Sequence, residues 1–330
     1  MKPTRNKFLI FFSGFVLLCL FLVGYLFIAI NRPSAGGSQI VSFDVVAGES
    51  LAQVAKELSQ EKLINSETLF RLYSRFDKRA SQIKVGRYQL SKNLTMGDLL
   101  DKLSKGPESL HITFVEGLRR EQLAAEFSKV AYSSTAYQEF MTASQGLEGY
   151  LFPDTYFVAQ QIEAKELVAL LSKTFEERVT TQTRNAFGAH GLSLSQAVVM
   201  ASLVEREAVS ETDRALVAGV LYNRLKNSWP LDIDASIQYA VSSLECVGQK
   251  DCNWWPSSLS AADLKIDSPF NTYTNPGLPP RPICNPSLSA LMAVANPTVS
   301  DYYFYVSDKQ GALHFAKTLE EHNANIARYL

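Results

Sequence analysis

The chain has 330 residues, of which 46% are hydrophobic and 20% are charged, so it can fill a hydrophobic core and is not disordered in bulk. At roughly 100–200 residues per domain, this length predicts about two domains. The 32 basic and 33 acidic side chains give a net charge of −1 without a block of like charge, which makes nucleic acid an unfavourable partner. Four scattered His residues and four Cys residues predict neither a metal site nor a cofactor.

An uncharged apolar stretch covers residues 8–30 near the N-terminus. As a helix it would be about 34 Å long, which is enough to cross a hydrocarbon core of about 30 Å. Basic side chains precede it, and none follows Arg32 until Lys56. The positive-inside rule therefore predicts a single-pass protein of the cytoplasmic (inner) membrane, with residues 1–7 in the cytoplasm and the body outside. A cleaved signal peptide is the alternative, but the stretch is long for one and ends in bulky residues.

Residues 31–39 predict a short tether because they are rich in Gly and Ser. A small domain of strands and helices follows over residues 40–106. We expect strands over 40–46 and 86–90, and helices over 51–58, 68–76 and 95–103, with Ser50 and Thr95 as N-caps. The stretch VVAGESLAQVAKEL resembles the small glycan-binding LysM module, and a plain spacer domain is the alternative.

Residues 107–330 predict a larger domain of the α+β class. Its first strand begins near His111, and an aromatic β-run covers residues 301–306. Gly- and Pro-rich loops separate the expected helices, which cover residues 120–127, 164–186 and 193–209. No nucleotide-binding loop, serine-hydrolase elbow or zinc-protease motif occurs in the sequence, so these three chemistries are disfavoured.

Three cysteines follow the apolar stretch. Cys246 and Cys252 bracket a loop-like segment, and outside the cytoplasm such a pair can form a local disulfide. Cys284 would then stay a buried free thiol. Zinc binding is the alternative, and the lack of a C-x-x-C pair or of His residues at ligand spacing argues against it.

The candidate catalytic residues lie in the helix expected over residues 193–209. Apolar side chains cover most of its surface, so the helix is expected to be buried, and Glu205 and Glu207 come near its end. Two residues along a helix turn by about 200°, so the pair cannot share one face, and periodicity does not choose between them. A carboxyl packed against apolar side chains has a raised pKa and can act as a general acid at neutral pH. The alternative is that both residues only mark where the helix reaches water.

Several segments in a fixed order resemble the YceG-like (MltG-type) endolytic murein transglycosylases. They are FVEG, EGYLFPDTY, ASLVEREA, DRALVAGVLYNRL, LDIDASIQY and NTYTNPGLPPRPICNP. The resemblance runs from about residue 40 to the end of the chain, and a membrane anchor with an outside body is also what the family has. The family's catalytic residue is the second Glu of an E-K-E motif, which reads Glu205-Arg206-Glu207 here. The resemblance therefore implies Glu207 as the catalytic residue.

The resemblance also implies a mechanism and partners. Glu207 would protonate the glycosidic oxygen between MurNAc and GlcNAc of a nascent peptidoglycan strand and then accept the proton of the C6 hydroxyl, which leaves a 1,6-anhydroMurNAc end. Such an enzyme would terminate strand elongation beside peptidoglycan synthases in the membrane. Asn271 and Tyr273 are the preferred substrate-binding pair. The full set of expected substrate-binding residues, each with loop architecture as the alternative role, is Asn223, Asp234, Ser236, Tyr239, Asn271, Thr272 and Tyr273.

Two other functions are kept as alternatives. A glycoside hydrolase would pair Glu207 with Asp232 or Asp234 as its base. A non-catalytic peptidoglycan-binding scaffold would need none of these carboxyls. Trp254 and Trp255 fit either stacking on a sugar or packing against the cysteine loop.

Overall fold

The computed structural model describes residues 4–34, 37–107, 109–131 and 133–330. Residues 1–3 of the predicted cytoplasmic segment and residues 35 and 36 of the predicted tether lie outside the described residues. The chain divides into two compact units. The N-terminal unit is Met1–Leu110 with Ala159–Gln161, and the C-terminal unit is His111–Val158 with Ile162–Leu330.

The first helix, α1 (Thr4–Asn31), contains the apolar stretch expected from the sequence. Within it, residues Phe12–Asn31 are long and apolar enough to cross a membrane, and none of this stretch is buried inside the protein. It is the single unbroken helix among the described residues that passes this test. Exposed Phe, Leu and Ile side chains on every face suit a hydrocarbon environment better than water.

The rest of the N-terminal unit is a strand–helix–helix–strand arrangement followed by another helix. The elements are β1 (Ile40–Val45), α2 (Leu51–Gln60), α3 (Glu67–Phe76), the 3-10 turn η1 (Lys78–Gln82), β2 (Gly86–Ser91) and α4 (Met96–Lys105). Strands β1 and β2 pair antiparallel, with Phe43 opposite Tyr88. The predicted N-caps Ser50 and Thr95 both accept a backbone N–H bond from the first turn of their helix. The likeness to the LysM module stays a prediction.

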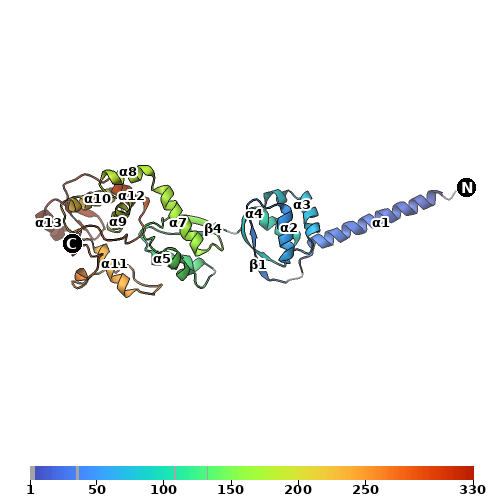
Figure 1. The fold of residues 1–330 in the computed structure, drawn as a ribbon, viewed down its shortest axis with the longest axis horizontal. Coiled ribbons are helices and arrows are strands. Elements are labelled where there is room, and N and C mark those ends of the chain that lie inside the picture. The colour runs from blue at the N-terminus through green and yellow to red at the C-terminus, as the bar shows by residue number, and fades with distance from the viewer. Residues whose placement is uncertain (1–3, 35–36, 108, 132) are drawn as a thin grey trace. The chain divides into compact units, whose positions relative to one another are not determined.

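The C-terminal unit is α+β and mostly helical (Figure 1). Its strands pair in two small two-stranded sheets, β3 with β4 and β5 with β6. Strand β3 (Ser109–Thr113) leads into it from the N-terminal unit. The elements that follow are α5 (Arg120–Val130), α6 (Ala136–Ala143), β4 (Thr155–Ala159), α7 (Ala164–Arg178), α8 (Thr181–Ala189), α9 (Leu194–Glu207), α10 (Glu211–Lys226), α11 (Asp234–Glu245), the 3-10 turn η2 (Asp263–Lys265), α12 (Leu288–Ala295), β5 (Phe304–Ser307), β6 (Leu313–Ala316) and α13 (Leu319–Tyr329).

Helix α9 runs through the core of this unit and contacts α8, α10, α11 and α12 (Figure 1). Every residue from 197 to 204 is buried, as the sequence predicts for a helix that is apolar around most of its surface. Ser193 caps its start by accepting from the N–H of Gln196. In α10, Gly219 lies where a Cβ would overlap the carbonyl of Thr298, so only glycine permits this close approach of backbones.

The helix expected over residues 164–186 is two helices, α7 and α8. Val179 leaves helical geometry with ψ 80°, and Thr180 is extended and caps α8 by accepting from the N–H of Thr183. Val179 is buried in the core, so the chain turns where this side chain is anchored. Local capping therefore breaks a pattern whose apolar periodicity continues across the turn.

Candidate active site

The two carboxyls at the end of α9 point to different partners, as their spacing requires. Glu205 accepts a bond from Nη2 of Arg214 at 2.8 Å and another from the backbone N–H of Ser287 at 2.8 Å. Its side chain is only 5% exposed. A buried carboxylate that is fully occupied by a guanidinium and by backbone joins α9 to α10 and α12, and it is not free to reach a substrate.

Glu207 is two residues further along α9, and it lies in the wall of a pocket of about 500 Å³. Its Oε2 accepts the hydroxyl proton of Tyr305 on β5 at 2.9 Å. Burial raises the pKa of Glu207 to about 7, the charge of Asp234 raises it further, and the bonds from Tyr305 and from the backbone of Ala235 work in the opposite direction. A carboxyl with a pKa of about 7 is half protonated at neutral pH, which suits a group that must first donate and then accept a proton.

A second carboxyl lines the same pocket, next to the backbone of Ala235 that bonds Glu207. Asp234 is the first residue of α11, and its Oδ1 accepts the hydroxyl proton of Tyr273 at 2.6 Å. Burial and the bond to Asp234 raise the pKa of Tyr273, so its hydroxyl stays protonated. The pocket thus brings together three carboxyls and two tyrosine hydroxyls. Glu207 is bonded to Tyr305, Asp234 to Tyr273, and Asp232 to Arg224.

Arg224 of α10 holds two walls of the pocket in place. Its Nη1 donates to Oδ2 of Asp232 at 3.0 Å and to the carbonyl of Leu231 at 2.8 Å, while its Nε donates to the carbonyl of Tyr303 at 2.7 Å. The residue is 7% exposed, so these bonds satisfy a buried cation. The segment before α11 and the strand that carries Tyr305 are therefore fixed to one side chain.

Among the eight site residues expected from the sequence, Glu207, Asp234 and Tyr273 line this pocket, and the other five do not. The amide of Asn223 donates to the carbonyls of Ser300 and Tyr302 at 2.8 and 2.9 Å, which fixes the approach to β5. The geometry gives Asn223 a scaffolding role.

A buried hydrogen-bond cluster accounts for three more of these residues. The hydroxyls of Ser236 and Thr272 lie 2.9 Å apart, and Thr272 Oγ1 accepts the N–H of Ile233 at 2.9 Å. The amide of Asn271 donates to the carbonyls of Leu264 and Ile266 at 3.1 and 2.9 Å. All three side chains are fully buried. Ser236 and Thr272 fix the start of α11, and hence Asp234, from the inside of the fold. Asn271 instead fixes the loop that carries Tyr273.

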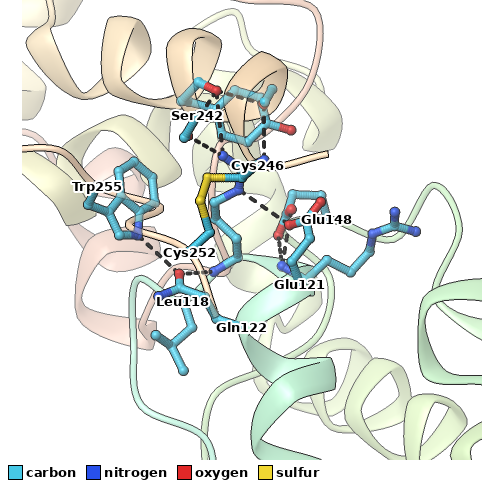
Figure 2. Close-up of polar contacts among 12 residues, drawn as sticks. Leu118, Glu121, Gln122, Glu148, Ser242, Cys246, Cys252 and Trp255 are labelled. Carbon is cyan, nitrogen blue, oxygen red and sulfur yellow. Dashed lines mark hydrogen bonds and ion pairs between the residues drawn. A yellow bond between two sulfur atoms is a disulfide. The ribbon is translucent and has the colours of Figure 1, made fainter. Parts of the chain in front are cut away.

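Tyr239 and the two tryptophans lie on another side of α11. Tyr239 and Trp254 sandwich the guanidinium of Arg119, at 4.0 and 4.6 Å from the ring centroids. Trp255 lies 3.9 Å from the guanidinium of Arg206 and donates from Nε1 to Gln122 (Figure 2). Both tryptophans are thus packed on protein groups.

The cysteine prediction is confirmed. Cys246 and Cys252 form a disulfide (Figure 2), and Cys284 is a buried free thiol. The thiol of Cys284 donates to the carbonyl of Ser202. The part of the chain that the structure describes contains no group of three or more His, Cys, Asp or Glu side chains that could hold a metal ion.

Sequence reasoning missed Tyr305, Arg224 and His322 as residues of the pocket. The signal for Tyr305 was the aromatic β-run, which identified the strand but not the partner of its hydroxyl. His322 on α13 stacks on Phe304, and burial together with the charge of Arg224 lowers its pKa. The imidazole in this pocket is therefore mostly neutral at neutral pH.

Three of the sequence segments singled out above meet at Asn285, which is fully buried. Its carbonyl accepts the N–H of Gly117 in FVEG, and its Oδ1 accepts the N–H groups of Gly149 and Leu151 in EGYLFPDTY. Gly149 has φ 86°, and a Cβ there would overlap Pro282. FVEG and EGYLFPDTY build the support behind the end of α9 and do not enter the pocket, whereas the third segment brings Tyr273 into it.

Comparison with known proteins adds an independent finding. A model of the YceG-like family matches residues 43–328. An endolytic murein transglycosylase of Bacillus subtilis (strain 168) is 30% identical over 318 residues, which cover 88% of this chain and 85% of that protein. One from Streptococcus pneumoniae serotype 2 (strain D39) is 28% identical over 335 residues, covering 90% of this chain and 59% of that protein, so the chain spans about three-fifths of the pneumococcal relative. The crystal structure of a yceG-like protein from Listeria monocytogenes has a TM-score of 0.53 and 26% identity, and the match covers 87% of this chain and 99% of that chain.

Proposed function

This chain belongs to the YceG-like family, and on that premise we propose that it is an endolytic murein transglycosylase whose catalytic residue is Glu207. It cuts the bond between MurNAc and GlcNAc inside a peptidoglycan strand and leaves a 1,6-anhydroMurNAc end. The observation that carries the assignment of Glu207 is its place in a pocket with a pKa raised to about 7, whereas Glu205 is occupied by Arg214.

The reaction needs one carboxyl in two protonation states. Protonated Glu207 donates its proton to the glycosidic oxygen as the bond to C1 of MurNAc breaks. The resulting carboxylate then takes the proton of the C6 hydroxyl as its oxygen closes on C1, so the carboxyl ends as it began. Neither water nor a second carboxylate nucleophile is consumed, unlike in a common glycosidase.

Tyr305 and Asp234 determine how readily Glu207 loses and regains its proton in this cycle. The Tyr305 hydroxyl holds Oε2 of Glu207 and stabilises the carboxylate formed after the first step. The negative charge of Asp234 opposes that carboxylate and favours the protonated starting form. Asp234 and Tyr273 also offer polar atoms to the sugar beside the scissile bond, so they are the substrate-binding residues of the proposal.

With α1 as a membrane anchor, this activity would lie at a membrane. With α1 as a single-pass span, N-terminus in the cytoplasm, the C-terminal unit would work at the outer face of the cytoplasmic membrane, where strands emerge from the synthases. Cutting there would end strand elongation. Peptidoglycan synthases in the same membrane are the expected partners.

The test is digestion of purified glycan strands by the full chain in detergent, with Glu207→Gln in parallel and mass spectrometry of the new ends. Anhydro ends that depend on Glu207 are the expected result. Reducing ends that incorporate ¹⁸O from labelled water would instead support a hydrolase that uses Asp232 or Asp234. Equal products from the wild type and Glu207→Gln would overturn the assignment and favour a non-catalytic scaffold.

A further inference from the structure

The C-terminal unit contains a second cavity, of about 560 Å³, that the proposed reaction does not use. It lies between the start of α5, the C-terminal half of α11, the N-terminal half of α9 and the disulfide loop. We call it the arginine cavity. The residues that matter for its chemistry are Arg119, Arg120, Glu148, Tyr239, Trp254 and Arg281.

One of these arginines is part of the wall. Arg119 is 2% exposed, donates to the hydroxyls of Ser242 and Ser243 at 2.7 and 3.0 Å and pairs with Glu121 at 3.3 Å (Figure 2). Its guanidinium is therefore already satisfied. It gives the cavity a rigid floor but no free donor.

The other two arginines carry charge that the protein does not neutralise. Within the described ranges, neither Arg120 nor Arg281 forms an ion pair with a carboxylate. Arg281 is exposed, and its guanidinium lies 6.0 Å from the ring of Phe270. Two guanidiniums at one cavity without carboxylate partners make a site for an anion, and their planar donor pairs suit a carboxylate.

Two carboxyls line this cavity, and neither opposes such an anion. Glu121 is already paired with Arg119 at 3.3 Å. Glu148 accepts the backbone N–H of Arg120 and the amide of Asn285 at 2.9 Å (Figure 2). Burial raises its pKa to about 8, so it is mostly neutral at pH 7. The cavity is therefore positive in sum.

The walls also fit a peptide. Tyr137, Tyr150 and Tyr239 supply flat apolar surface. A peptide offers apolar side chains to such rings as well as carboxylates to arginine.

The arginine cavity lies within a short distance of the catalytic pocket along shared elements. Val199 of α9 lines the cavity and Glu207 ends the same helix, eight residues and thus about 12 Å further. Helix α11 likewise connects the two sites, because its Asp234 lines the catalytic pocket and its Tyr239 lines the arginine cavity. An extended peptide of five residues reaches roughly 16–18 Å, so a peptide carried by a sugar near Glu207 spans this separation.

We propose that the arginine cavity binds a stem peptide of the murein strand through a peptide carboxylate held by Arg120 and Arg281. This inference rests on the proposed function, because it supplies the substrate that carries such a peptide. Binding in the arginine cavity makes the enzyme select strands whose peptides are still attached, and this selection occurs at a site apart from Glu207.

The first test compares two substrates, intact strands and strands stripped of peptide by an amidase. The measured quantity is the ratio of kcat/KM for the intact strands to that for the stripped strands, on the full chain in detergent. We expect this ratio to exceed one in the wild type and to fall about tenfold in Arg281→Gln, the size expected when one charge-assisted hydrogen bond is lost. Arg328→Gln, an exposed arginine outside both pockets, is the matched control and should keep the wild-type ratio.

The second test measures binding without catalysis. The full chain with Glu207→Gln is titrated with the pentapeptide L-Ala-γ-D-Glu-L-Lys-D-Ala-D-Ala and with the same peptide as its C-terminal amide. Saturable binding that Arg281→Gln weakens about tenfold supports the proposal, and weaker binding of the amide identifies the C-terminal carboxylate as the group held. A wild-type ratio of one, or peptide binding that Arg281→Gln leaves intact, would overturn it. Activity on stripped strands tests the proposed function separately, so the two failures are distinguishable.

Discussion

The hydroxyl of Tyr305 lies 2.9 Å from Oε2 of Glu207, although 98 positions separate the two residues in sequence. This bond ties strand β5 to the last residue of α9. It stabilises the charged form of the carboxyl against the burial that disfavours it, and the pKa of Glu207 is about 7 as a result. Tyr305 and Asp234 thus shift the balance between the protonated and the charged form of Glu207, and either side chain can be removed by substitution.

The first prediction concerns the pH dependence of the wild type. Glu207 must be protonated in order to donate a proton to the glycosidic oxygen. The value of kcat/KM on peptide-free strands should therefore fall as pH rises through about 7, and well above pH 7 it should fall tenfold per pH unit. Initial rates of anhydro-end formation between pH 5 and 9 measure this. A rate that stays level up to pH 9 would contradict Glu207 as the general acid.

Two substitutions should shift the midpoint of this fall in kcat/KM in opposite directions along the pH axis. Tyr305→Phe removes a bond that lowers the pKa of Glu207, so the midpoint should shift to higher pH. Asp234→Asn removes a negative charge that raises this pKa, so the midpoint should shift to lower pH. Both variants should also lose kcat. Shifts of the same sign in the two pH profiles would mean that these groups act on the reaction in some other way.

Substituting the two carboxyls of α9 one at a time should affect different properties, catalytic activity for Glu207 and folding stability for Glu205. Glu207→Gln should abolish anhydro-end formation, since an amide cannot donate the proton. Glu205→Gln should keep most activity per folded molecule but destabilise the protein by about 3–5 kcal/mol, because Arg214 loses its buried carboxylate partner. Activity assays with thermal unfolding of both variants measure this. If Glu205→Gln were as inactive as Glu207→Gln while fully folded, the choice between the carboxyls would fail.

Burial of Glu207 should also make the wild type less stable at high pH. Its pKa of about 7 lies above the ordinary 4.5, so between these values the native state holds a proton that the unfolded chain has released. The unfolding free energy therefore falls as pH rises from 4.5 to 7, and burial of Glu148 adds to the same slope up to about pH 8.

Glu207→Gln removes one of these two contributions. The variant should be more stable than the wild type at pH 8 by on the order of 1–2 kcal/mol, after allowance for solvent at the mouth of the pocket, and equal to it near pH 4. Thermal unfolding across this pH range measures the difference. A variant with the same stability as the wild type at pH 8 would show that Glu207 is well solvated.

The local parts of this fold could be predicted and the long-range ones could not. Ser50 and Thr95 begin their helices as expected, because a cap is a matter of three neighbouring residues. Helix α10 gave no usable pattern, since its buried face includes Gly219 and Arg224 and its apolar periodicity is weak. The break at Val179 was not predicted because the apolar periodicity continues across it, although Thr180 caps α8 locally.

The candidate site shows the same division. The resemblance singles out Glu207, but nothing near it in sequence indicates Tyr305, which arrives from β5 through tertiary folding. Asn223 and Ser236 were expected at the substrate and instead hold backbone groups. Ser and Asn side chains serve buried backbone as readily as a ligand, and residue type alone does not distinguish the two roles.

The disulfide gives a last prediction, on stability. Cys246 and Cys252 are six residues apart, and closing so short a loop should stabilise the protein by about 2 kcal/mol through the entropy of the unfolded chain. The double variant Cys246→Ser, Cys252→Ser should therefore unfold at lower urea concentration than the wild type. Tryptophan fluorescence reports the transition locally, because Trp254 packs on Arg119 beside this loop.

Reduction gives the matched comparison. Dithiothreitol should lower the urea midpoint of the wild type to that of the double variant, and it should leave the double variant itself unchanged. Cys19→Ser, which alters an exposed thiol of α1, should behave as the wild type in both conditions. If the wild type and the double variant unfolded together without reductant, the two cysteines would not be bonded in the native protein. The wall of the arginine cavity at Cys246 would then be held by packing alone.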